Sequence, residues 1–175
     1  MEYPNVRRAQ NADQEAVGKL WQQLLSEQSE LDDRMGVADD APERWHNDFP
    51  VWLEDETARI YVAEADGALV GFVTARRWGP PPIYKESSEV YLDELYVRPD
   101  SRREGYGTQL VHAVRDWADQ LEARRIRLRV LTSNQAGRSF WAAQEAIPMS
   151  MTFTIEGKQP PEKRGTDEGS KKIGF

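Results

Sequence analysis

One segment, Val90 to Thr108, restricts the fold of this chain more than any other. Residues Glu89 to Val97 read as a strand, an arginine-rich turn follows, and Gly105 and Gly107 open a helix that we expect to run to Glu122. Glycines leave backbone N–H groups unshielded, and a helix N-terminus offers free donors and a partial positive charge. The segment therefore predicts an α/β fold with a phosphate or pyrophosphate at this loop, or else a plain connection with solvated arginines.

The remaining chain alternates strand and helix signals. Pro50 leaves the far end of the second helix undetermined, because proline disfavours a helix interior. Apolar alternation and the Asp66-Gly67 pair predict strands at 5–9, 59–64, 68–76, 126–131 and 149–155. Capping residues and helical spacing predict one helix from Asn11 or Asp13, one from Asp40 and one over 135–145. We expect one domain over residues 1–156 and a charged, Gly- and Pro-containing disordered tail over 157–175.

Composition excludes several kinds of chemistry. The 175 residues carry a net charge of −7, contain no cysteine and include two histidines. Disulfides, thiolate metal sites and cysteine nucleophiles are excluded, and neither a metal centre nor a Ser-His-Asp triad is expected. The acidic balance disfavours nucleic-acid binding. No apolar run approaches the roughly 20 residues of a membrane span, and no secretory signal is present, so we expect a cytoplasmic protein without membrane contact.

The central motif resembles that of the GNAT family of N-acetyltransferases. Arg102-Arg-Glu-Gly105-Tyr-Gly107 fits the family signature R/Q-x-x-G-x-G/A, and the preceding stretch from Leu92 to Pro99 is similar to its central strand. Asn134 with Phe140-Trp141 resembles a second family block. The resemblance covers nearly the whole body and implies a GNAT-like acyl-CoA N-acyltransferase fold, with a mixed, mostly antiparallel sheet of about six or seven strands and helices on both faces.

The resemblance also implies the cosubstrate, acetyl-CoA. Its pyrophosphate would lie on the glycine loop, its pantetheine arm would pair with the central strand, and a backbone N–H near Tyr96 or Val97 would polarise the thioester carbonyl. The residues assigned to acetyl-CoA by resemblance are Leu95, Tyr96, Val97, Arg102, Arg103, Glu104, Gly105, Tyr106, Gly107, Thr108, Asn134 and Trp141.

The sequence departs from the family pattern at three places. Arg103 replaces a glycine that many members carry, which adds charge near the phosphates. Trp141 stands where many members have a tyrosine that protonates the leaving thiolate, and an indole N–H is not a useful acid. Glu145-Ala146 replaces a Gly-Phe pair. Because a thiol of pKa about 8.5 leaves tolerably as thiolate, we expect an enzyme without a dedicated acid.

Two adjacent carboxylates are the candidates for catalysis. An alkyl ammonium of pKa about 10 must lose a proton before it attacks, and a carboxylate near the strand centre can accept that proton. Asp93 and Glu94 fit by resemblance, but neighbours on a strand point to opposite faces, so only one should face the cleft and the other is a solvated strand residue. The residues expected to shape the acceptor site are Glu89, Trp45, Trp78 and Tyr84, while Trp21 and Trp52 read as core.

The expected function is transfer of an acetyl group from acetyl-CoA to a primary amine of a small molecule or protein, by direct attack. One rival is a non-catalytic acyl-CoA-binding regulatory module of the same fold, and another is a binder of a different phosphate ligand. The basic run from Arg124 to Arg129 reads as a solvated sheet face, with the adenosine 3′-phosphate or a nucleic acid as alternatives. No nucleic-acid or membrane partner is expected, and the resemblance allows a homodimer.

Overall fold

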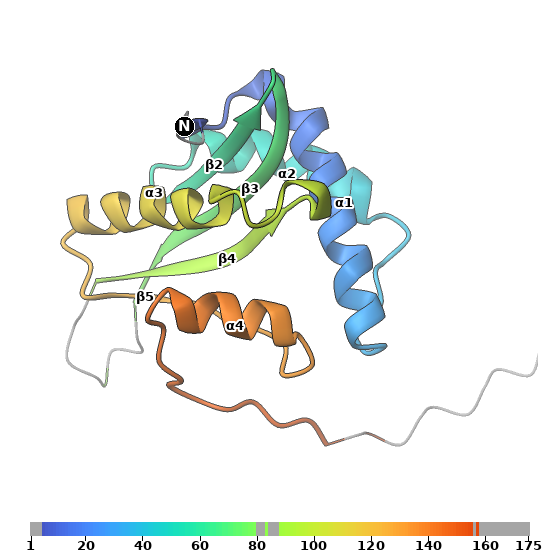
Figure 1. Cartoon of the computed structure of the whole chain (residues 1–175), viewed down its shortest axis with the longest axis vertical. Coiled ribbons are helices and arrows are strands. Elements are labelled where there is room, and N and C mark those ends of the chain that lie inside the picture. The colour runs from blue at the N-terminus through green and yellow to red at the C-terminus, as the bar shows by residue number, and fades with distance from the viewer. Residues whose placement is uncertain (1–4, 80–82, 84–87, 156, 158–175) are drawn as a thin grey trace, which may run out of the picture.

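A computed structural model describes residues 5–79, 83, 88–155 and 157 of the chain (Figure 1). The described strands are β1 (Asn5–Arg8), β2 (Ala58–Ala65), β3 (Ala68–Trp78), β4 (Glu89–Val97) and β5 (Arg125–Arg127). The helices are α1 (Gln14–Leu31), α2 (Ala41–Glu54), α3 (Tyr106–Gln120) and α4 (Gln135–Ala143), with short 3₁₀ turns at Asn11–Asp13 and Pro99–Ser101. The order of elements agrees with the sequence expectation up to α4.

The strands form one mixed sheet in the order β1-β2-β3-β4-β5. The pairs β1–β2, β2–β3 and β3–β4 are antiparallel, and β5 runs parallel to β4. The β2–β3 hairpin turns at Asp66 and Gly67, which have φ angles of 49° and 75°. Two consecutive positive φ angles define the turn that matches strand twist, so the Asp-Gly prediction is confirmed.

Helices cover both faces of the sheet, as expected. On one face α1 and α2 place Val17, Leu20 and Phe49 against Val62 and Phe72 of the sheet. On the other face α3 contributes its apolar stripe. The residues of that second core are Ala63, Val70, Val73, Ala75, Val90, Leu92, Leu110, Val114, Trp117 and Ala118. The mixed sheet between helical layers confirms the α/β architecture.

Helix α2 continues through Pro50 to Glu54, so the helix end that the sequence left undetermined lies beyond the proline. A proline inside a helix removes one N–H donor and leaves the carbonyl four residues earlier without its usual partner. Here that carbonyl belongs to His46, and the Gln14 side chain of α1 donates a 2.6 Å hydrogen bond to it. The cost of Pro50 is therefore offset by a contact between α1 and α2.

Two expectations for the C-terminal part are wrong. The strand predicted for 126–131 is only the three-residue β5, and the strand predicted for 149–155 does not form. The described residues consequently hold five strands rather than six or seven. Periodicity reports which faces are apolar, but a strand also needs a neighbour to pair with, and 149–155 has none among the described residues.

The predicted tail beyond Gly157 lies outside the described residues. Over the same described ranges, no helix is both long and apolar enough to span a bilayer.

Candidate active site

A β-bulge in the middle of β4 shapes the site. Thr74 of β3 pairs with Glu94, but the next residue, Ala75, pairs with Leu92, so Asp93 is the extra residue in the ladder. The apolar alternation shifts at this point, because Leu92 and Leu95 both pack on the α3 side. The expectation that Asp93 and Glu94 face opposite sides is therefore wrong. The bulge brings both side chains into one cleft.

Glu94 is held by two donors from different elements. The Trp21 indole Nε1 of α1 donates to its Oε1 over 2.7 Å, and the Thr74 hydroxyl donates to its Oε2 over 2.8 Å. Burial raises the pKa of the Glu94 carboxyl above its ordinary value of 4.5, the two hydrogen bonds lower it in part, and the neighbouring Asp93 raises it further. The result is a positioned carboxylate with increased affinity for a proton, which suits a general base.

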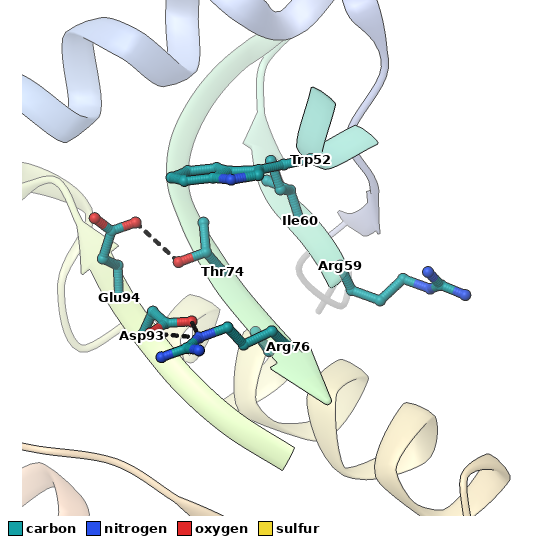
Figure 2. A pocket seen from close by; sticks show the side chains of 8 residues that line it. Trp52, Arg59, Ile60, Thr74, Arg76, Asp93 and Glu94 are labelled. Carbon is teal, nitrogen blue, oxygen red and sulfur yellow. Dashed lines mark hydrogen bonds and ion pairs between the residues drawn. The ribbon is translucent and has the colours of Figure 1, made fainter. Parts of the chain in front are cut away.

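The cleft beside these carboxylates has a volume of about 410 Å³ (Figure 2). Trp52 of α2 and Ile60 of β2 form its apolar wall, opposite the two carboxylates. The Arg76 guanidinium lies 3.0 Å from the Asp93 carboxylate and stacks over the Tyr91 ring at 5.3 Å. Asp93 is thus already paired with a cation, whereas the hydrogen bonds to Glu94 come from neutral donors.

A second hollow of about 430 Å³ lies between α1 and α2 and shares Trp52 with the cleft. Trp21 and Trp45 also line it, and their rings stack at 4.9 Å. Trp45 is only 4% exposed and belongs to the core, which the sequence did not make obvious. Trp52, read from the sequence as core, is half-buried and lines both hollows.

The other expected acceptor residues lie apart from the cleft. Glu89 is 2% exposed and pairs across the sheet with Arg125 at 3.1 Å and Arg127 at 3.6 Å. Trp78 lies at the end of β3, and the Arg127 guanidinium stacks over its ring at 4.7 Å. Two arginines of the basic run thus bind β5 to the sheet. Tyr84 lies outside the described residues.

Strands β4 and β5 separate just beyond these ion pairs. Their pairing ends at Tyr91 and Arg127, although β4 continues to Val97. Residues 92–97 of β4 therefore have no strand on their β5 side within the described part of the chain. The predicted cosubstrate residues Leu95, Tyr96 and Val97 lie along this open stretch. Unpaired backbone groups on a strand edge are available to an extended ligand.

The glycine loop between β4 and α3 has an unusual backbone. Arg103 and Gly105 adopt φ angles of 70° and 91°, and α3 starts immediately afterwards at Tyr106. A left-handed φ costs about 1–2 kcal/mol for a residue with a Cβ, which explains why glycine is common at the position of Arg103. A Cβ on Gly107 would lie 3.2 Å from the Phe140 ring, so this glycine allows α4 to pack against the start of α3. Both glycines therefore have structural reasons of their own.

Three other predicted loop residues have different surroundings. The Arg102 side chain donates to the Val97 carbonyl at 2.9 Å and to Glu27 of α1 at 2.7 Å. Thr108 accepts a 3.2 Å hydrogen bond from Gln144, and Glu104 is exposed. Arg102 thus joins the loop to α1 rather than extending free into solvent.

Glu27 is a link that sequence reasoning missed. Besides Arg102, the Tyr96 hydroxyl donates to it at 2.8 Å. Burial and the bond to Glu27 raise the pKa of Tyr96 to about 12, so its hydroxyl stays protonated at neutral pH. The missed contacts of Glu27, Trp21 and Thr74 all join residues distant in sequence, and no local motif marks them.

Two predicted residues lie on α4. The Asn134 Oδ1 accepts the Gly137 N–H at 2.8 Å and caps the helix, a role that the sequence allowed for either Ser133 or Asn134. Trp141 lies against the core on the α3 side, with its ring 5.0 Å from that of Phe140. The cosubstrate roles assigned to both residues stay predictions.

Comparisons with known proteins bear on the family and the fold. The acetyltransferase (GNAT) family profile matches residues 20–144. An uncharacterized N-acetyltransferase, YhfO, of Bacillus subtilis is 27% identical over 140 residues, covering 78% of this chain and 85% of the relative. Another uncharacterized N-acetyltransferase, from Archaeoglobus fulgidus, is 32% identical over 100 residues, covering 57% of this chain and 67% of that relative.

Solved structures share the fold at low sequence identity. A tetramutant of the BH1408 protein from Bacillus halodurans superimposes with a TM-score of 0.78 at 17% identity, covering 87% of this chain and 99% of that one. Aminoglycoside N-acetyltransferase AAC(6')-Iy in complex with CoA gives a TM-score of 0.73 at 18% identity, covering 89% and 95%.

The chain therefore belongs to the acetyltransferase (GNAT) family. The family and fold inferred from the glycine motif are confirmed, and acetyl transfer is the class of reaction.

Proposed function

We propose that this protein transfers an acetyl group from acetyl-CoA to a primary amine bound in the cleft between Trp52 and the β4 carboxylates. One observation carries the proposal. The bulge at Asp93 directs two adjacent carboxylates into a cleft next to the stretch where β4 loses its β5 neighbour. An amine-binding group and an extended cosubstrate would then meet on the same short piece of strand.

Glu94 is the proposed general base. The substrate ammonium gives one proton to the Glu94 carboxylate, directly or through a water molecule, and the free amine attacks the thioester carbonyl. A C–N bond forms and the C–S bond breaks. The nitrogen loses its second proton to solvent water, and solvent water gives a proton to the thiolate. Two neutral hydrogen bonds hold the carboxylate, and its raised pKa brings its basicity closer to that of the amine.

Asp93 has a different proposed role. Its carboxylate is paired with Arg76 on the floor of the same cleft, and both side chains are partly exposed. An incoming ammonium can share this carboxylate with Arg76, so we assign Asp93 to amine binding rather than to proton transfer. The apolar wall of Trp52 and Ile60 would pack against the carbon atoms next to the amine.

The residues of the glycine loop and of the open β4 edge are suited to hold acetyl-CoA. Helix α3 begins directly after Gly105, and its first turn offers free N–H groups. Gly105 and Arg103 both have left-handed backbone, an arrangement that favours an anion. The open edge of β4 supplies amide and carbonyl groups for an extended pantetheine chain. Support also comes from the structural neighbour AAC(6')-Iy, which was solved with CoA.

Trp141 favours a second candidate function. It occupies the position at which the family usually has a tyrosine acid, so the chain would suit a non-catalytic acyl-CoA-binding module. Both candidates require acetyl-CoA binding, so the measurement that distinguishes them is turnover.

Calorimetric titration with acetyl-CoA, followed by a thiol-release assay over a panel of primary amines, tests the proposal. We expect micromolar binding and turnover of at least one amine. Replacing both carboxylates (Asp93→Asn with Glu94→Gln) should abolish turnover and preserve acetyl-CoA binding, whereas Glu15→Gln on the exposed start of α1 should change neither. Binding without turnover of any amine favours the regulatory module, and unchanged turnover in the double variant refutes the assignment of the carboxylates.

A further inference from the structure

The ion pair between Arg76 and Asp93 places two opposite charges side by side in the cleft. Arg76 of β3 donates from its Nε atom to both oxygens of the Asp93 carboxylate, at 3.2 and 3.0 Å (Figure 2). The two side chains are 51% and 34% exposed, and both line the cleft. Each charge is therefore accessible to a further partner of opposite sign.

The Arg76 guanidinium has hydrogen-bond donors that the protein does not use. Among the described residues its bonds come from Nε alone, and neither terminal nitrogen donates to a protein group. The Tyr91 ring of β4 lies 5.3 Å from the guanidinium and restrains its plane. Two adjacent N–H donors on a planar group match the two oxygens of a carboxylate, which is a strong form of ion pairing. Arg76 can thus bind a second carboxylate in addition to Asp93.

The strand geometry sets the distance between this anion site and the proposed base. Thr74, whose hydroxyl donates to Glu94 over 2.8 Å, lies two residues before Arg76 on β3. Side chains two residues apart on a strand leave from the same face, about 7 Å from each other. An ammonium at Glu94 and a carboxylate at Arg76 are each a hydrogen bond away from their partners, so they must lie close together in one molecule. An α-amino acid meets this requirement, because it carries both groups on a single carbon atom.

We propose that the acceptor is a free α-amino acid with an apolar side chain, an inference that rests on the proposed function. Its ammonium binds Asp93 and Glu94, and its carboxylate binds the terminal nitrogens of Arg76. Its side chain packs against the apolar wall of Trp52 and Ile60. The cleft volume of about 410 Å³ is in the lower part of the range for small-molecule sites, which favours one small acceptor. A polyamine or a protein amino group brings no carboxylate on the neighbouring carbon and would leave the Arg76 donors without an anion.

Matched substrate pairs in the thiol-release assay test this acceptor class. L-Phenylalanine is compared with 2-phenylethylamine, and L-leucine with 3-methylbutylamine, because the members of each pair differ only in the carboxylate. We expect the wild type to have a higher kcat/KM for each amino acid than for its amine. Arg76→Gln should reduce this preference by about 10- to 100-fold, as expected for the loss of hydrogen bonds between charged groups. Comparing the ratio between enzymes cancels the difference in amine pKa between the two substrates.

The matched control is Arg77→Gln. It removes the same charge from the neighbouring exposed position, on the opposite face of β3, and should leave the preference unchanged. A wild-type preference for the decarboxylated amines, or an equal preference for the amino acids in the wild type and Arg76→Gln, overturns the proposal.

Equilibrium binding distinguishes failure of this inference from failure of the proposed function. L-Phenylalanine and L-leucine are titrated calorimetrically into the chain with excess CoA, which has no acetyl group to transfer. We expect binding that Arg76→Gln weakens at least tenfold and that Arg77→Gln does not weaken. Turnover of amines without any dependence on Arg76 refutes the amino-acid assignment alone. Binding through Arg76 without turnover of any amine supports the amino-acid site and refutes the catalytic function, and the absence of binding by both amino acids overturns the proposal.

Discussion

Replacing Glu94 with glutamine removes the proposed base while keeping the local structure. The amide oxygen of the introduced side chain would accept the Trp21 indole N–H, and its NH₂ group would donate to the Thr74 hydroxyl, which can rotate to accept. Both existing hydrogen bonds therefore have a counterpart in the variant. Loss of a general base typically lowers the reaction rate by about 10²- to 10⁴-fold. Because water can partly substitute for the base here, we expect kcat/KM for the amine to fall by about 10²- to 10³-fold. That decrease corresponds to a rise in the activation free energy of about 3–4 kcal/mol.

The same substitution should have the opposite effect on stability. Burial raises the folded-state pKa of Glu94 above its ordinary value of 4.5, so between that value and the raised one the folded state holds a proton that the unfolded state has lost. The contribution of Glu94 to the free energy of unfolding consequently falls as pH rises through this window and stays low above it. Glutamine has no such loss, so the variant should gain stability relative to wild type as pH rises from 4.5 to 7.5.

Two measurements check these expectations. Thiol release over a pH series gives kcat/KM, and the cysteine-free chain contributes no background to the assay. Wild-type activity should decline toward acid pH at a value above 4.5, and the variant should lack that limb. Urea unfolding at pH 4.5 and 7.5 gives the stability difference. A variant with kcat/KM within about threefold of wild type, or one whose relative stability falls as pH rises, would refute the reasoning.

Three further substitutions probe separate parts of the fold. Arg103→Gly relieves a left-handed φ of 70°, so it should raise the free energy of unfolding by about 1 kcal/mol, and lower stability would contradict this account. Because the substitution also removes a charge near the proposed phosphate site, acetyl-CoA binding measured by calorimetry should weaken severalfold. Asp13→Asn breaks a two-bond pair with Arg7, at 2.7 and 2.8 Å, and should cost about 2–3 kcal/mol at pH 7 in urea unfolding. Because the Arg7 bond lowers the pKa of Asp13 below 3.8, that stabilisation is present at neutral pH and is lost as pH falls through the acid range, so an equal cost at pH 2 would argue against it. Gly71→Ala places a Cβ 2.7 Å from the Tyr96 carbonyl and should lower stability by about 1–3 kcal/mol, with an unchanged melting temperature as the refuting result.

Features determined by local sequence were predictable. The Asp66-Gly67 turn needs two positive φ angles, and the Asn134 cap needs one short side chain before a helix, so each signal lies within a few residues. The Gly105-Tyr-Gly107 motif likewise marked the start of α3 and the family.

Features that depend on pairing between distant segments were not predictable. The bulge at Asp93 results from the register between β3 and β4, which alternation within β4 alone does not contain. The Trp21–Glu94 and Arg102–Glu27 bonds join residues 73 and 75 positions apart. Glu89 was misjudged because its arginine partners lie on the following parallel strand, 36 and 38 positions later.

The bulge in β4 has a consequence for how such a protein can change during evolution. Because the strand alternation restarts at Asp93, Leu92 and Leu95 keep the core on the α3 side intact while two consecutive positions face the cleft. Either position can then mutate without placing a polar group in that core. Under the proposed function, acceptor preference can thus change through single substitutions at 93 and 94 while the core on the α3 side is preserved.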